Sequence, residues 1–109
     1  MRNIDHEECW CLFLNRTNAL IAKERMTTGG QDFTLFDKRV IIRRALERKA
    51  SSVILVHNHP SGSAQPSVQD NELTERVAEA CKLFDIRLLD HVIIARGTHF
   101  SFRAHNLIR

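Results

Sequence analysis

The sequence lacks the features of a membrane protein and of a disulfide-stabilised one. None of its apolar runs approaches the ~20 residues that a membrane-spanning helix needs. The first residues, Met-Arg-Asn-Ile-Asp, lack the apolar segment of a secretory signal peptide. The 3 cysteines, an odd number, argue against a disulfide framework and for a reducing compartment. We therefore expect a cytoplasmic protein that does not contact membranes.

The chain also contains no internal repeat, low-complexity stretch or linker. Its 109 residues, 43% of them hydrophobic, can support one core and hardly two. We therefore expect a single domain over residues 1–109.

The segment around residue 57 predicts a strand that carries two histidines. Residues 51–56 form a short, β-branched apolar run, which is typical of a buried strand. His57 and His59 extend this strand, and residues two apart on a strand point to the same face. Residues 60–62, Pro-Ser-Gly, then end the strand and turn the chain. Both imidazoles can therefore reach one point in space.

A helix is predicted directly after this turn. Ser67 is a favourable N-cap, and a helical apolar pattern follows it. Asp70 then falls in the first helical turn, where the helix dipole favours its charge. The helix start and the strand end form a rigid frame for three side chains.

His57, His59 and Asp70 together predict a site for one divalent metal. Imidazole and carboxylate ligands suit zinc, and three protein ligands leave a fourth position for water. Each fragment also has a purely structural interpretation, because Ser67-x-x-Asp70 resembles a capping box and His-x-His on a strand is often a packing feature. The succession of both fragments favours the metal site, with one zinc ion per chain.

The remaining pattern predicts an α/β sheet with two main helices packed on it. Strands are expected at 9–14, 19–25, around 33–36, at 86–95 and at 99–102, and helices after Asp37 and after Ser67. The expected inner faces are Val40, Ile41, Ala45 and Leu46 on the first helix, and Leu73, Val77, Cys81 and Phe84 on the second. Cys9, Cys11 and Cys81 are interpreted as small core residues, and a zinc site built on Cys9, Cys11 and a histidine is a third choice.

The chain resembles the JAMM (MPN-plus) metalloproteases. His57-x-His59, seven residues and Ser67-x-x-Asp70 match that pattern at every defined position. The longer string from His57 to Gly62, with Pro66 ahead of Ser67, resembles the RadC branch, as does the Asp90-His91 strand. The resemblance covers nearly the whole chain and implies a cytidine-deaminase-like JAMM/MPN sandwich with a mixed sheet. Two differences from the branch are expected. The sequence starts directly at the JAMM domain, without the usual helix-hairpin-helix region, and is either a trimmed piece or a short paralogue; it also has Lys-Arg-Val at 38–40 where Pro-Arg-Glu is usual.

The resemblance also implies roles for individual residues. Zinc would be held by His57, His59 and Asp70, and the hydroxyl of Ser67 would polarise the substrate carbonyl. A glutamate ahead of the first strand would act as general base, and alignment places Glu7 there, with Glu8 as the fallback. The implied substrate is a peptide or protein, cleaved at a peptide or isopeptide bond. For His91, a structural role is favoured over an Asp90–His91 contact that tunes a metal ligand.

The rival hypothesis is a DNA-repair-associated, nucleic-acid-binding accessory protein whose metal site is structural or vestigial. RadC proteins carry a DNA-repair label, and this chain has a net charge of +3 and a pI near 9.1. Arg39, Arg43, Arg44, Arg48 and Lys49 could form a basic stripe on the first helix. A solvated helix face is the favoured interpretation, because basic charge alone gives weak, salt-sensitive binding. The sequence leaves the substrate and the oligomeric state open.

Overall fold

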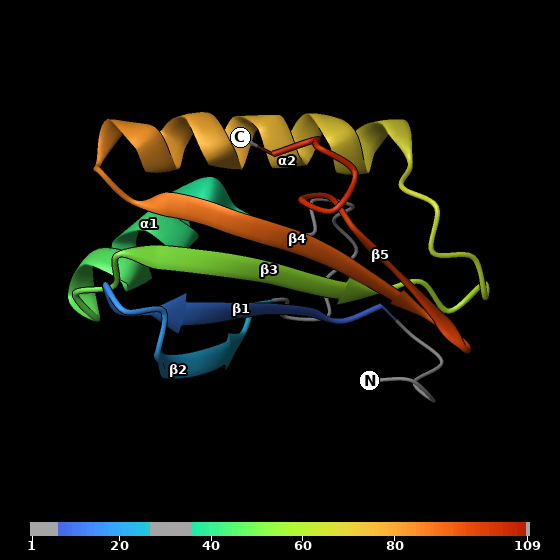
Figure 1. The fold of residues 1–109 in the computed structure, drawn as a ribbon, viewed down its shortest axis with the longest axis horizontal. Coiled ribbons are helices and arrows are strands. Elements are labelled where there is room, and N and C mark those ends of the chain that lie inside the picture. Colours follow the sequence, from blue (N-terminus) through green and yellow to red (C-terminus); the bar gives the residue numbers. More distant parts are fainter. Residues whose placement is uncertain (1–6, 27–35, 109) are drawn as a thin grey trace.

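The structure, a computed structural model, describes residues 7–26 and 36–108. Its elements are β1 Cys9–Leu14, β2 Leu20–Arg25, α1 Lys38–Glu47, β3 Ser52–Asn58, α2 Val68–Leu83, β4 Arg87–Ala95 and β5 Thr98–Ser101 (Figure 1). The strands form a five-stranded sheet in the order β2-β1-β3-β4-β5. Strands β3 and β4 are parallel and the other neighbours are antiparallel. The predicted α/β fold with a mixed sheet and two packed helices is confirmed.

The parallel pair places the start of α2 beside the end of β3. Two parallel neighbours need a crossover connection, because the chain must return to the end of the sheet where the first strand began before the second strand can start. Here α2 is that connection, and its long axis runs back over the sheet (Figure 1). The loop between β3 and α2 therefore lies at the carboxyl end of the parallel strands, where α/β folds commonly bind ligands.

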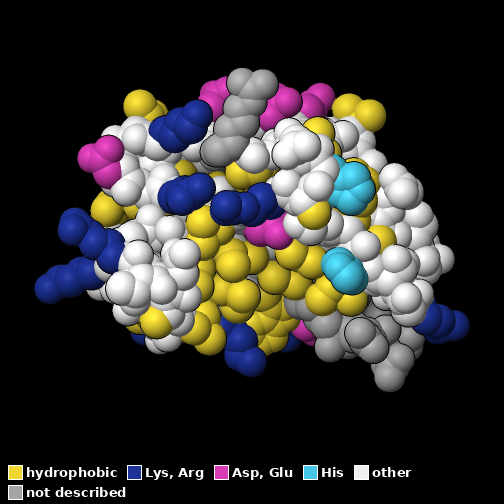
Figure 2. Space-filling model, viewed as in Figure 1, with side chains coloured by type: hydrophobic (Ala, Val, Ile, Leu, Met, Phe, Trp, Pro, Cys, Tyr) yellow, Lys and Arg dark blue, Asp and Glu magenta, His cyan; other side chains and the backbone are white. Residues whose placement is uncertain are grey.

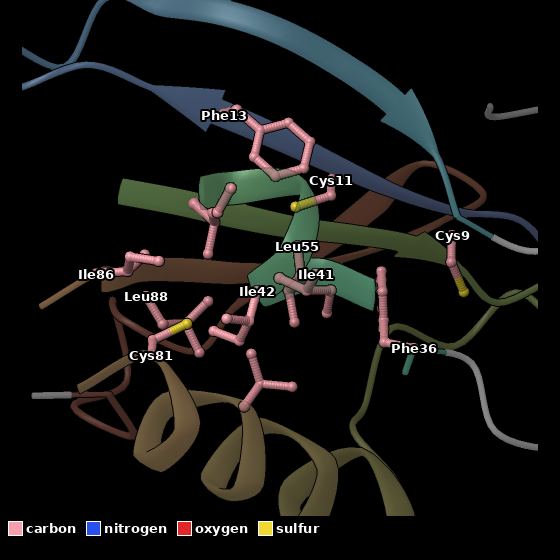
Figure 3. Close-up of a cluster of buried hydrophobic side chains, with 13 residues drawn as sticks. Cys9, Cys11, Phe13, Phe36, Ile41, Ile42, Leu55, Cys81, Ile86 and Leu88 are labelled. Carbon is pink, nitrogen blue, oxygen red and sulfur yellow. The ribbon is translucent and has the colours of Figure 1, made fainter. Parts of the chain in front are cut away.

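The core lies between one face of the sheet and both helices. Register pairs Cys11 with Leu55 and Phe13 with Val53, so these side chains share a face. The buried cluster on this face contains Cys9, Cys11, Phe13, Val53, Leu55 and Leu88 from the strands and Ile41, Ile42, Ala45, Val77 and Cys81 from the helices (Figure 3). The interpretation of all three cysteines as core residues is confirmed, and all three are free thiols.

The opposite face of the sheet carries half-buried apolar side chains. They alternate with the core residues and are Trp10, Leu12, Ile54, Val56, Val92 and Ile94. Figure 2 looks onto this face and shows hydrophobic side chains gathered over the middle of the sheet, with Lys and Arg around them. Both helices of the described residues therefore pack on the side that also holds His57 of β3.

Two predicted core positions are wrong. Leu46 and Phe84 are each 50% exposed. Leu46 lies near the end of α1, and Phe84 is the C-cap residue of α2, where the helical periodicity stops. Both side chains line an open groove between the two helices, so they are not covered by the sheet. The buried residues of α1 are Ile41, Ile42 and Ala45.

The strand expected around 33–36 falls mostly on residues 33–35, which lie outside the described residues. Phe36 is described, and it is a buried residue that precedes α1. No helix in the described part of the chain is both long and apolar enough to cross a membrane.

Candidate metal centre

The end of β3 holds the first candidate ligand. His57 is paired with Cys9 on β1 and with Ile93 on β4, so its side chain points to the helix-covered face. The imidazole is fully buried. β3 ends at Asn58, but the N–H of His59 still donates to the Ile94 carbonyl oxygen at 2.8 Å. This bond continues the extended path by one residue and keeps both imidazoles on one side.

The Pro-Ser-Gly turn then directs the chain towards α2. Gly62 has a φ of +94°, a region that side chains of L-residues rarely adopt. Its N–H donates to the His59 carbonyl oxygen at 3.3 Å. The next residue, Ser63, places its carbonyl oxygen 2.9 Å from His59 Nδ1. The turn therefore orients the second imidazole as well as reversing the chain.

The third candidate ligand belongs to a complete capping box. Ser67 Oγ accepts a hydrogen bond from the Asp70 N–H at 3.0 Å, and the Ser67 N–H donates to Asp70 Oδ2 at 2.8 Å. The capping and ligand interpretations are therefore compatible. Burial alone would raise the pKa of Asp70, but the neighbouring His57 imidazole and the hydrogen bond from the Ser67 N–H hold that pKa well below its usual range. The carboxylate is therefore ionised at neutral pH.

The three side chains meet at their ligand atoms. His57 Nε2 lies 3.0 Å from His59 Nε2 and 3.4 Å from Asp70 Oδ1, and His59 Nε2 lies 3.3 Å from Asp70 Oδ2. Zinc–ligand bonds of about 2.0–2.2 Å at a tetrahedral angle imply ligand–ligand separations of about 3.3–3.5 Å. Each imidazole lies at such a distance from one oxygen of the Asp70 carboxylate, His57 from Oδ1 and His59 from Oδ2, and the two Nε2 atoms are slightly closer to each other. Two imidazole nitrogens and a carboxylate within 4.8 Å of one another therefore fit a zinc-sized cation.

The frame leaves one side of the group accessible. The side chain of His59 is 15% exposed, whereas those of His57 and Asp70 are 0% and 4% exposed. Ser67 is exposed, and its Oγ already accepts the Asp70 N–H. A hydroxyl can donate while it accepts, so this serine can still offer its hydrogen to a ligand.

The structure separates the two candidate glutamates. The buried carboxylate of Glu8 accepts a hydrogen bond from Trp10 Nε1 at 3.1 Å and lies 3.5 Å from Arg25 Nη2. Glu7 is exposed. The pKa of the Cys9 thiol is raised by burial and then by the charges of Glu7, Asp70 and Glu8, in that order. Glu7 therefore lies close enough to the Cys9 face, which also holds His57, for its charge to act there.

Asn58, between His57 and His59, holds the backbone at Glu8 in place. Its N–H donates to the Glu8 carbonyl oxygen at 3.3 Å, and its side-chain oxygen accepts the Glu8 N–H. These two bonds hold the start of β1 against the end of β3. No role for Asn58 was predicted from the sequence.

His91 contacts a candidate ligand directly, a role that was not predicted from the sequence. Its imidazole is fully buried, with Nε2 at 2.8 Å from His57 Nδ1 and Nδ1 at 2.7 Å from Thr74 Oγ1. Burial and the neighbouring His57 lower the pKa of His91 to about 3, so it is neutral near pH 7. Phe36 packs edge-on against both histidines, with ring centroids 6.3 Å from His57 and 5.9 Å from His91.

The Asp90–His91 side-chain contact, which was the less favoured interpretation, does not form. Consecutive strand residues point to opposite faces, so the Asp90 carboxylate turns away from the His91 ring. It accepts hydrogen bonds from the Ser101 hydroxyl at 2.6 Å, from the His91 N–H at 2.7 Å and from the Arg103 N–H at 3.0 Å. Asp90 therefore fixes the turn after β5. His91 contacts His57 without any contribution from the Asp90 carboxylate.

The basic stripe of α1 is partly neutralised. Arg44 and Arg48 both form ion pairs with Glu24 on β2, and the Arg48 pair has an N···O distance of 3.0 Å. Arg39 pairs with its own helix cap, Asp37, at 3.3 Å. Three of the five stripe residues are therefore engaged by carboxylates of the same chain.

A mixed sheet with a His-His-Asp group between a strand end and a helix start is the arrangement of a JAB/MPN-type α/β domain. A family model described as "RadC-like JAB domain" matches residues 1–107. The chain belongs to the RadC-like JAB domain family.

Curated relatives agree with this assignment. The chain is 44% identical over 108 residues to UPF0758 protein YeeS of Escherichia coli (strain K12), covering 99% of this chain and 73% of the relative. It is 42% identical over 109 residues to a UPF0758 protein of Porphyromonas gingivalis, covering 99% and 48%. A UPF0758 protein of Flavobacterium johnsoniae is 40% identical over 99 residues, covering 91% and 43%. The chain thus spans less than half the length of the last two relatives, and the names of the three state no activity.

Proposed function

We propose that this domain is a zinc-dependent hydrolase of the JAMM type, which cleaves a peptide or isopeptide bond. The observation that carries the proposal is the convergence of His57 Nε2, His59 Nε2 and the Asp70 carboxylate, which lie within 4.8 Å of one another and suit a zinc-sized cation. The group is open on the side of His59 and Ser67, as a catalytic site requires and a closed structural site does not.

Zinc held by these three residues would polarise the scissile carbonyl and lower the pKa of an attacking water molecule from 15.7 towards about 7. Glu7 would take the proton of that water and deliver it to the leaving amine nitrogen. The hydroxyl of Ser67 would donate to the carbonyl oxygen as negative charge develops on it. Its acceptance of the Asp70 N–H holds the Ser67 oxygen in place.

A nucleic-acid-binding role is the weaker alternative. Arg44 and Arg48 would have to leave Glu24 before they could neutralise phosphates. Phosphate contacts supply most non-specific affinity for nucleic acid, so occupied arginines contribute less to it. Substitution of Arg43 and Arg44 by Glu should leave zinc binding and hydrolysis unchanged if the hydrolase assignment is correct.

The deciding experiment measures zinc content and zinc-dependent cleavage together. We expect about one zinc ion per chain by plasma mass spectrometry, and loss of the metal in Asp70→Ala. Asp70→Asn keeps an oxygen that accepts the Ser67 N–H but removes the negative charge of the ligand. It therefore tests the ligand role of Asp70 while the helix cap is kept. Glu72→Gln, which removes an exposed charge on the same helix, should retain the metal.

Cleavage is then tested with a peptide library and with lysine isopeptide substrates, using mass spectrometry to find new termini. We expect products with zinc-loaded protein and none with the chelated protein or with Asp70→Ala. Stoichiometric zinc without any zinc-dependent product from either substrate class would contradict the hydrolase assignment.

A further inference from the structure

A chain of buried polar contacts leads from one candidate ligand to the backbone of another. His57 Nδ1 lies 2.8 Å from His91 Nε2, and His91 Nδ1 lies 2.7 Å from Thr74 Oγ1. Thr74 Oγ1 in turn lies 2.7 Å from the carbonyl oxygen of Asp70, one turn earlier on α2. The three side chains are at most 2% exposed, so water cannot supply missing partners.

The contacts fix the direction of every hydrogen bond. A carbonyl oxygen only accepts, so Thr74 must give its single hydroxyl hydrogen to Asp70. Thr74 Oγ1 then accepts from His91 Nδ1–H. A neutral imidazole has one N–H, so His91 Nε2 accepts from His57 Nδ1–H. The reverse order would leave the 2.7 Å contact between the Thr74 and Asp70 oxygens without a hydrogen.

The scheme requires a neutral His91, and its surroundings are apolar on both sides. Its ring stacks on Phe102 with centroids 4.7 Å apart and an interplanar angle of 6°. Phe36 covers the ring edge-on at 5.9 Å. Full burial between two aromatic rings disfavours a charged imidazolium.

The consequence appears at the ligand atom of His57. With its proton on Nδ1, His57 presents a free lone pair on Nε2 towards His59 and Asp70. His59 reaches the same state more directly, because its Nδ1–H donates to the Ser63 backbone carbonyl at 2.9 Å. Only His57 therefore depends on other side chains for its tautomer.

We propose that His91 and Thr74 are positioning residues that hold His57 in the tautomer with a free Nε2 and thereby set the affinity of the site for zinc. The inference rests on the proposed function for zinc ligation, and it does not require peptidase activity. Outer partners that orient histidine ligands in this way typically change metal affinity by 10–100-fold when they are lost.

The test uses a matched pair of substitutions at Thr74. Thr74→Val keeps the shape but removes the hydroxyl, which leaves His91 Nδ1–H without an acceptor. The His91 proton then moves to Nε2 and faces His57 Nδ1, which forces the His57 proton onto the ligand atom. Thr74→Ser keeps the hydroxyl and serves as the control.

Zinc dissociation constants are measured by competition with a chromophoric chelator. We expect Thr74→Val to bind zinc about 10–100-fold more weakly than wild type, and Thr74→Ser to stay within about threefold. A merely structural role for Thr74 would lower the melting temperature and leave the zinc dissociation constant unchanged. That outcome, with wild type binding zinc normally, would overturn the tautomer inference and leave the proposed hydrolase standing.

Nitrogen-15 NMR of the wild-type histidine rings tests the same scheme without any variant. In the zinc-loaded protein we expect His57, His59 and His91 each to carry a proton on Nδ1. A His91 proton on Nε2 would overturn the inference directly, even if Thr74→Val does not fold. A wild-type protein that binds no zinc would overturn both this inference and the proposed function.

Discussion

At the scale of single residues, neighbours in the sequence have separate environments. Glu7 and Glu8 differ by one position, and alternation at the start of β1 sends their side chains to opposite sides of the sheet. Glu8 is engaged with Trp10 and Arg25 on the open face. Glu7 is exposed, and its charge raises the pKa of the Cys9 thiol, on the face of the histidines, more than the charge of Glu8 does. The assignment of Glu7 as general base follows from this difference and stays a prediction.

The pair Glu7→Gln and Glu8→Gln tests the assignment. Glu7→Gln should keep one zinc ion per chain but lower kcat by ~10²-fold or more, because it removes the proton acceptor. Glu8→Gln should lower stability by about 1 kcal/mol through its weakened contact with Arg25, and change kcat by less than about threefold. Steady-state rates on a confirmed substrate and urea unfolding distinguish the two effects. The opposite pattern of rates would move the base to Glu8.

The candidate ligands could be predicted from the sequence because their spacing is local. His-x-His on a strand and Ser-x-x-Asp at a helix start each place side chains within one element. The role of His91 could not be predicted in this way. It is 34 positions from His57, and the two rings meet only because β3 and β4 are parallel, with Leu55 opposite His91. Local periodicity contains no information about which strands pair or in which register.

At the scale of elements, the helix starts were predictable and the helix ends were not. Asp37 and Ser67 were identified as caps, and both accept the expected backbone N–H. The ends are Schellman motifs without glycine. Lys49 N–H donates to Leu46 and Ala50 N–H to Ala45 after α1, and Asp85 and Ile86 repeat the pattern after α2. The left-handed residues are Lys49 and Asp85, both with φ of 56°.

Glycine at these two positions should therefore stabilise the protein. A side chain in the left-handed region costs about 1 kcal/mol or more, partly offset by the greater unfolded-state entropy of glycine. We expect Lys49→Gly and Asp85→Gly each to raise the free energy of unfolding by about 0.5 kcal/mol, measured by urea unfolding. Glu75→Gly, at an exposed position inside α2, is the control and should lower it by about 1 kcal/mol. If all three variants lose stability, the two helix ends are not strained.

At the scale of the whole molecule, a polar cluster lies at one end of a one-sided apolar core. The buried face of the sheet continues from Cys11 and Leu55 to His57 and His91 without a change of side. The core residues and the imidazoles are therefore covered by the same helices. Folding must desolvate the His91 imidazole together with the apolar side chains, so the stability of the whole domain is linked to the protonation of His91.

This linkage predicts a loss of stability in mild acid. His91 has a pKa of about 3 in the folded protein, against about 6.5 in an unfolded chain. Above pH 6.5 it is neutral in both states and does not affect the pH dependence. Between pH 6.5 and 3 the unfolded state binds the extra proton, so stability falls as pH falls, with a slope from this residue of up to about 1.4 kcal/mol per pH unit.

Urea unfolding of the chelated protein at several pH values between 7.5 and 4.5 measures the slope, and chelation removes the contribution of metal release. His91 lies beside the candidate metal ligands, so the informative quantity is the difference from His91→Gln, which keeps all three of them. The variant should lose less stability than wild type on acidification, although it can be less stable at pH 7.5. Parallel curves for the two proteins would mean that His91 binds protons equally in the folded and unfolded states, contrary to its burial between Phe36 and Phe102.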